Sequence, residues 1–140
     1  MTAENQFAVR GMHIDLRVQV MRMSALKDLV LEHKRMGLNT IVMEWEAAFP
    51  YREHATISNG LAYTREEVRS FVRLAEENGV DVIPLQHCFG HAEYILRHNR
   101  YHELREDSTR LSQVCPLKHD KARKVFGEIF RDVAGLHNSK

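Results

Sequence analysis

Strand-forming and helix-forming segments alternate along this sequence, and that alternation most constrains its fold. Short apolar segments typical of β-strands lie at Val9–Leu16, Thr40–Glu46 and Val80–Leu85, and a helical pattern follows each of them. Strands separated by helices form parallel sheets, because the chain returns to the same end of the sheet before the next strand begins. The sequence therefore predicts an α/β fold with three β/α units.

The predicted helices have recognisable ends. The first begins near Ser24, a residue type that often caps helices, and ends at Gly37. The second begins at Thr64, and Glu67 three positions later completes a capping box. Apolar residues at helical spacing are expected to face the core: Leu26, Leu29, Val30 and Met36; Val68, Phe71, Val72 and Ala75; and, between Pro116 and about Leu136, Ala122, Val125, Phe126, Ile129, Phe130 and Val133.

A parallel sheet of this kind is either an open doubly wound layer or part of a closed barrel. No glycine-rich phosphate loop follows the first strand, which argues against a nucleotide-binding sheet. Each strand ends in polar residues, as in barrel enzymes, which carry their chemistry on the C-terminal rim. We therefore predict that residues 1–140 form one domain, the first three β/α units of a TIM (β/α)8 barrel. Three strands cannot close a barrel, so a segment of a longer chain or a homo-oligomer paired through open strand edges is expected.

Composition narrows the range of partners. The formal net charge is +1, with 20 Lys and Arg against 19 Asp and Glu, so no electrostatic argument favours nucleic acid or an anionic membrane. No apolar run is long enough to span a bilayer, and the first residues lack the pattern of a secretory signal, which predicts a cytoplasmic protein. Cys88 and Cys115 have no metal-knuckle spacing and are expected to be reduced thiols without an assigned role.

Carboxylates and imidazoles gather where the second and third strands end. Glu44 and Glu46 are two residues apart and are predicted to share one strand face, opposite Met43 and Trp45. His87 and His91 are expected in the loop after the third strand. The four side chains could contact a sugar or hold a divalent metal; a solvated strand end and histidines bonded to local backbone are the alternatives.

The first strand adds a second polar group. His13 and Asp15 share a face, whereas the direction of Arg10 depends on whether Gly11 forms a bulge. Two other clusters have simpler interpretations: the charged stretch from Arg97 to Arg110 is expected to be a solvated helical surface, and the methionines are expected to fill the core.

Several motifs in order give the sequence a resemblance to a known family. They are VRGMHID at the first strand, MEWEAAFPY after the second, YTREE before the second helix, and VIPLQHCFGHAEY at and after the third strand. Together they resemble the β-N-acetylhexosaminidases of glycoside hydrolase family 20, over nearly the whole chain. The resemblance implies the TIM barrel and an amino-sugar glycoside substrate, with no cofactor and no metal.

The resemblance also implies roles for individual residues. Arg10 would bind hydroxyl groups of the terminal sugar. His91 and Glu46 would belong to a hydrogen-bonded relay with the catalytic acid, with Glu44 as second choice for the acidic member. His87, Asp15 and Glu44 are further candidates for contact with the sugar.

The family hydrolyses its substrate with retention, and the substrate's own 2-acetamido carbonyl attacks the anomeric carbon. An adjacent Asp-Glu pair after the fourth strand orients that group and protonates the leaving oxygen. This sequence has no such pair and ends where the fourth strand is expected, so the isolated chain is expected to be inactive. The alternatives are a divalent-metal barrel enzyme using Glu44, Glu46, His87 and His91, and a non-catalytic sugar-binding or assembly module.

Overall fold

The computed structural model describes residues 7–139 and contains a three-stranded parallel sheet. Its strands are β1 (Gly11–Asp15), β2 (Thr40–Glu44) and β3 (Asp81–Leu85), in the spatial order β1-β2-β3. Asp15, Glu44 and Leu85 are paired in register, so the three strands end level with one another. The predicted α/β architecture is confirmed.

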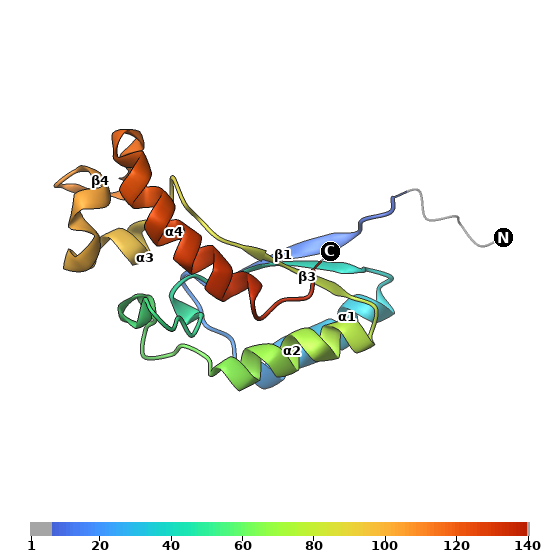
Figure 1. Cartoon of the computed structure of the whole chain (residues 1–140). Helices are drawn as coiled ribbons and strands as arrows, with labels where there is room; N and C mark the ends of the chain where they lie inside the picture. Colours follow the sequence, from blue (N-terminus) through green and yellow to red (C-terminus); the bar gives the residue numbers. More distant parts are fainter. Residues whose placement is uncertain (1–6, 140) are drawn as a thin grey trace.

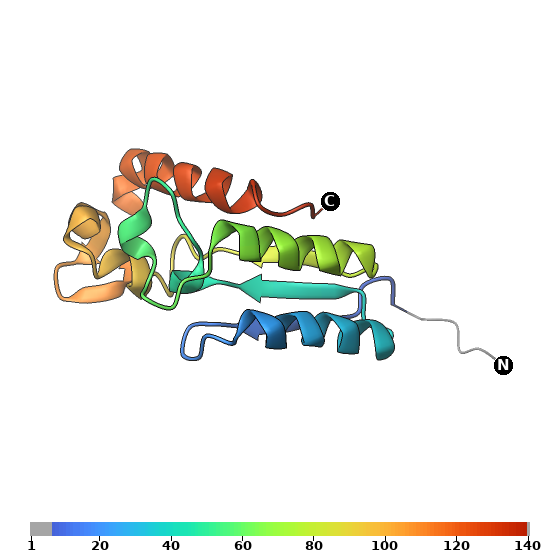
Figure 2. The same ribbon diagram turned by 90° about the horizontal axis from the view of Figure 1, so that it is seen from below.

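Three long helices follow the three strands: α1 (Met23–Arg35), α2 (Arg65–Glu77) and α4 (His119–Ala134). Figure 2 shows them side by side in the order α1, α2, α4, running alongside the strands. The predicted capping box at the start of α2 is confirmed, because the Thr64 hydroxyl accepts from the Glu67 amide and the Glu67 carboxylate accepts from the Thr64 amide.

The core lies between the sheet and these helices. Ile14, Met43 and Val82 project from alternate positions of the strands into this layer, and Trp45 is buried just beyond β2. The Trp45 ring meets Tyr63 and Phe71 edge-on at centroid distances of 5.6 and 5.7 Å. Trp45 thus packs the β2–α2 loop against Tyr63 of the same loop and against Phe71 of α2.

The opposite face of the sheet is open. It carries the alternate residues of each strand, among them His13, Val42 and Ile83, and His13 and Ile83 are exposed. Among residues 7–139, β1 and β3 each pair with β2 alone. Within the described part of the chain the sheet thus has two unpaired edges and one uncovered face, and pairing with a second copy through those edges stays a prediction.

Some local expectations are wrong. Arg22, not Ser24, is the N-cap of α1, and it makes no side-chain capping bond. Met36 is exposed because it is the C-cap residue beyond the last turn, and Phe130 and Met12 are also exposed. Among the methionines that the structure describes, Met43 is the one that is fully buried.

The charged stretch after β3 is not one helical surface. It contains the short helix α3 (Glu93–Leu96), a 3₁₀ helix (Asn99–Leu104) and an antiparallel hairpin of β4 (Arg105–Asp107) and β5 (Arg110–Val114). The hairpin turns at Asp107, whose carboxylate accepts from the amide and hydroxyl of Thr109. Figure 1 shows α3 and the hairpin beyond the C-terminal ends of the strands, next to the start of α4.

No helix among the described residues is both long and apolar enough to cross a membrane.

His137, just beyond α4, connects that helix to the core. Its Nε2 accepts from the Trp45 indole N–H at 2.9 Å, and its Nδ1 donates to the Val133 carbonyl at 2.8 Å. This pattern requires a neutral ring, and burial lowers the pKa of His137 below its usual value.

We expect His137→Gln to remove a pH-dependent contribution to stability. Because the folded-state pKa is lowered, the contribution is present above about pH 6.5 and is lost as the pH falls through the folded value. Urea denaturation should show the wild type losing stability relative to the variant below about pH 6.5, by at most about 1.4 kcal/mol per pH unit. The exposed His119→Gln is the control, and parallel pH curves for wild type and His137→Gln would contradict the prediction.

Candidate functional site

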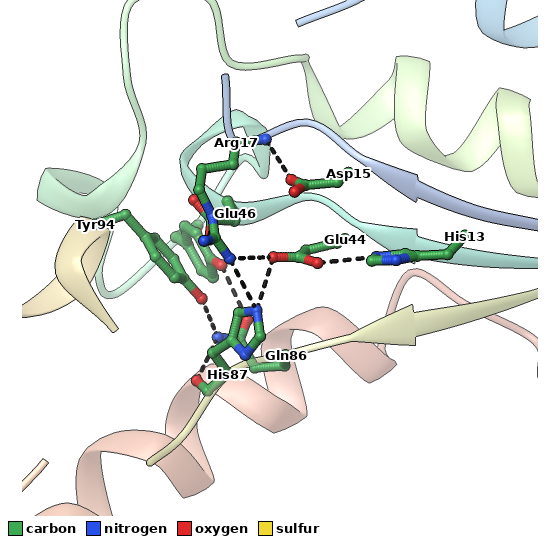
Figure 3. A network of polar contacts seen from close by, with 9 residues as sticks. His13, Asp15, Arg17, Glu44, Glu46, Gln86, His87 and Tyr94 are labelled. Carbon is green, nitrogen blue, oxygen red and sulfur yellow. Dashed lines mark hydrogen bonds and ion pairs between the residues drawn. The ribbon is translucent and has the colours of Figure 1, made fainter. Parts of the chain in front are cut away.

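The site lies at the C-terminal ends of the three strands. Glu44 ends the central strand, and the loops after β1, β2 and β3 bring Arg17, Glu46 and His87 towards it (Figure 3). Because parallel strands present their C-terminal ends at one edge of the sheet, residues far apart in sequence meet here.

Glu44 is the centre of the network. Its side chain is 4% exposed, and its two oxygens meet three groups: Oε2 lies 2.9 Å from His13 Nε2, and Oε1 lies 2.7 Å from His87 Nε2 and 2.9 Å from Arg17 Nη2. Burial alone would raise the pKa of Glu44, but hydrogen bonds from His87 and Arg17 outweigh it and lower the pKa. Glu44 is therefore a buried, ionised acceptor.

Arg17 joins the two glutamates. Its Nη2 donates to Glu44, while its Nε donates to Glu46 Oε1 at 2.9 Å. The carboxylate of Asp15 accepts the Arg17 backbone N–H at 2.7 Å and so forms a tight turn at the end of β1. That turn folds the guanidinium back over the end of β2.

Glu46 does not lie on the strand as predicted. β2 ends at Glu44, and Glu46 begins a 3₁₀ helix, η1 (Glu46–Ala48), with a φ of 46°. This left-handed conformation is uncommon for a residue other than glycine and is typical of functional sites. The glutamates therefore meet through Arg17 rather than through the two-residue period of a strand.

Burial raises the pKa of Glu46 to about 7, although Arg17 acts in the opposite direction. The adjacent carboxylates thus differ: Glu44 is ionised near neutral pH, whereas Glu46 exchanges a proton there. Two carboxyl groups with separated pKa values are a common arrangement for acid-base chemistry.

Gln86 fixes the backbone that carries His87. Its Oε1 accepts from the Tyr51 hydroxyl at 3.0 Å, and its Nε2 donates to the His87 carbonyl at 3.0 Å and to the Tyr94 hydroxyl. Tyr51 comes from the β2–α2 loop and Tyr94 from α3, so two other segments hold this position. Figure 3 shows Tyr94 beside Gln86. Burial raises the pKa of both phenols.

Of the residues predicted from sequence, Glu44, Glu46 and His87 come together, with Asp15 beside them. His91 does not join them: it is exposed, has a φ of 53°, and within residues 7–139 forms no hydrogen bond to Glu46. Its ring lies 5.2 Å from that of His87, centroid to centroid. A relay of His91 with Glu46 therefore stays a prediction without a contact in this structure.

Arg10 lies at the wrong end of β1 for the predicted contact. Its Nε donates to the Gly37 carbonyl at 2.8 Å and its Nη1 to the Phe7 carbonyl at 2.6 Å, beside the start of the sheet. β1 pairs with β2 in regular register at Gly11, so no bulge turns the Arg10 side chain towards the rim, and contact of Arg10 with the sugar stays a prediction. Arg17 supplies the guanidinium at the rim instead, and its position two residues after Asp15, just past the strand, was the available signal.

Glu44, Glu46 and His87 also offer ligand atoms within 4.8 Å of one another, the kind of donor set a divalent metal uses. The guanidinium of Arg17 already donates to both carboxylates and supplies the positive charge between them. A metal at this position would have to displace Arg17.

Comparison with known proteins shows what the chain is similar to. No protein-family model matches it. It is 32% identical over 140 residues to hexosaminidase D from Homo sapiens, covering 98% of this chain and 28% of that protein. The chain thus spans under a third of the length of this curated relative.

Solved structures share the fold. A chitobiase from Flavobacterium johnsoniae matches with a TM-score of 0.83 and 24% identity, over 96% of this chain and 23% of the chitobiase. A mutant β-hexosaminidase from Streptomyces plicatus in complex with its product GlcNAc matches with a TM-score of 0.79 and 18% identity, over 96% of this chain and 31% of that one. These matches confirm that the three β/α units have the fold of part of a TIM barrel.

We expect Glu46→Gln to change the pH dependence of stability. The folded-state pKa of Glu46 is about 7, above that of an unfolded glutamate, so its contribution is fully present below about pH 4.5 and is lost as the pH rises through about 7. Urea denaturation from about pH 5 to 8 should show the variant gaining relative to wild type, by at most about 1.4 kcal/mol per pH unit.

Glu66→Gln, at an exposed position of α2, is the matched control and should show no such gain. A constant difference between Glu46→Gln and wild type across this pH range would mean that Glu46 titrates as an ordinary carboxyl group.

Proposed function

We propose that this chain, a hexosaminidase-like segment of glycoside hydrolase family 20, forms one wall of the sugar site of an enzyme that removes terminal N-acetylhexosamine. The observation that carries the proposal is the network of Glu44, Arg17, Glu46 and His87 at the C-terminal ends of the strands. Active sites of TIM-barrel enzymes lie at that end, and the relatives are hexosaminidases.

The network suits a neutral, polar ligand. Arg17 and the two imidazoles offer hydrogen-bonding groups, while the charges of Glu44 and Arg17 are satisfied by each other. The same sheet face carries Val42, Ile83 and Leu85, against which the apolar face of a sugar ring can pack. Mixed polar and apolar walls are typical of small-molecule sites.

The proposed reaction is substrate-assisted hydrolysis with retention. The acetamido carbonyl attacks the anomeric carbon, and an acid protonates the leaving oxygen. No aspartate in these 140 residues is directly followed by a glutamate, so the Asp-Glu pair would come from outside the segment. Glu46, with a pKa of about 7, would exchange protons with that acid, and Arg17 would keep Glu46 in place.

A divalent-metal enzyme is the second candidate. The observation that favours it is the set of Glu44, Glu46 and His87 ligand atoms within 4.8 Å of one another. A metal ion at this place would compete directly with Arg17 for the carboxylates of Glu44 and Glu46.

Arginine substitution tests the sugar site. Arg17→Ala should weaken binding of N-acetylglucosamine to the chain about tenfold or more, because hydrogen bonds to a charged group contribute about 1.5–3 kcal/mol. Arg10→Ala, at the other end of β1, is the matched control and should leave binding unchanged. Binding is followed by amide chemical shifts in an NMR titration; weakening by Arg10→Ala alone would contradict the assignment.

The isolated 140-residue chain should not hydrolyse an aryl N-acetyl-β-glucosaminide above the uncatalysed rate, with an active hexosaminidase as the positive control. Turnover by this chain alone would show that the segment holds a complete set of catalytic groups. It would overturn the proposal that the Asp-Glu pair comes from outside the segment.

Zinc titration separates the two candidates. Calorimetry should detect no stoichiometric zinc binding to the wild-type chain, because Arg17 already donates to both carboxylates. The Arg17→Ala variant should bind zinc more strongly than the wild type does. Tight one-to-one binding by the wild type that Glu44→Gln abolishes would favour the metal enzyme.

A further inference from the structure

We infer that Glu44 holds His13 and His87 in one ring tautomer, so that the Nδ1 atom of each accepts a hydrogen bond from a hydroxyl group of the bound sugar. The inference rests on the proposed function and names two acceptors within that site. Glu44 acts as a positioning residue, and the two histidines touch the sugar.

The tautomer follows from what a carboxylate can do. Both oxygens of Glu44 face an imidazole Nε2, at 2.9 Å from His13 and 2.7 Å from His87. An ionised carboxylate only accepts hydrogen bonds, so each Nε2 must carry a hydrogen. Arg17 Nη2 lies 3.4 Å from His87 Nε2, but two donors face each other there, so this contact leaves the assignment unchanged.

A neutral ring that carries its hydrogen on Nε2 has a lone pair on Nδ1. Among residues 7–139 neither Nδ1 atom has a hydrogen-bond partner, and the side chains of His13 and His87 are 48% and 21% exposed. His13 comes from β1 and His87 from the loop after β3, on either side of the strand that ends in Glu44 (Figure 3). The structure therefore presents two acceptors that flank one carboxylate.

The surroundings select hydroxyl groups over cations. The guanidinium of Arg17 lies against His87 and would repel a metal ion at that ring. In the neutral form of the two rings, the lone pairs on Nδ1, beside the apolar side chains of Val42 and Ile83, match a ligand with O–H donors and an apolar face. A sugar has both.

The experiment uses the 140-residue chain labelled with ¹⁵N in its histidine rings. At about pH 8, where an ordinary imidazole is neutral, two-bond ¹H–¹⁵N spectra report which nitrogen carries the hydrogen. We expect His13 and His87 to show hydrogen on Nε2 alone, while the exposed His119 shows a mixture. In Glu44→Gln one amide oxygen replaces two acceptor oxygens, so at least one of the two rings should change tautomer.

N-acetylglucosamine is then added. The Nδ1 signals of His13 and His87 should move, and His13→Ala or His87→Ala should weaken binding by about three- to tenfold, the effect of one lost hydrogen bond. His119→Ala is the matched control and should not change binding.

Four outcomes overturn the inference: a mixture of tautomers in the wild-type chain, sugar binding that leaves both Nδ1 signals unmoved, stoichiometric zinc binding at these two rings, or no sugar binding at all. Sugar binding with unmoved Nδ1 signals leaves the proposed function intact. Absence of binding at the highest soluble sugar concentration removes both.

Discussion

A buried carboxylate at the end of the central strand is the constraint on which the rest of this site depends. Removing Glu44 from water costs several kcal/mol unless donors replace the lost hydration. Three donors do so, and they come from β1, from the loop after β1 and from the loop after β3. The conformation of both loops is therefore tied to one side chain. Loss of any donor would leave an under-satisfied charge.

Glu46 lies in the same surroundings as Glu44, but its pKa is raised whereas that of Glu44 is lowered. Glu46 shares Arg17 with Glu44 but, among the described residues, lacks a histidine donor, and burial then dominates its pKa. Its left-handed backbone lies directly after Trp45, whose buried ring packs against Tyr63. Packing and electrostatics thus combine to keep one glutamate charged and the other able to exchange a proton near neutral pH.

The sequence predicted the three β/α units and the capping box at Thr64 because these depend on local patterns. It predicted that Glu44, Glu46 and His87 gather because parallel strands end at the same edge of the sheet. It could not place Glu46 correctly, since nothing local signals that β2 ends at Glu44 and that the next turn is left-handed. Arg17 was missed because its role depends on a turn set by the Asp15 carboxylate. The sequence left the direction of Arg10 open, because a motif carries no information about which end of a strand its side chain reaches. The hairpin at Asp107 lies in a charged stretch without a clear period.

The fold matches part of a TIM barrel, and the network lies at the end of the strands where such barrels bind their substrates. The central claim is that Glu44 and Arg17 together form a preorganised wall of an amino-sugar site. A crystal structure of the chain with N-acetylglucosamine tests it most directly. The account predicts the sugar against His13, Arg17 and His87, with the two contacts from Arg17 to Glu44 and Glu46 unchanged. A sugar bound elsewhere, or an Arg17 side chain turned away from both glutamates, would contradict it.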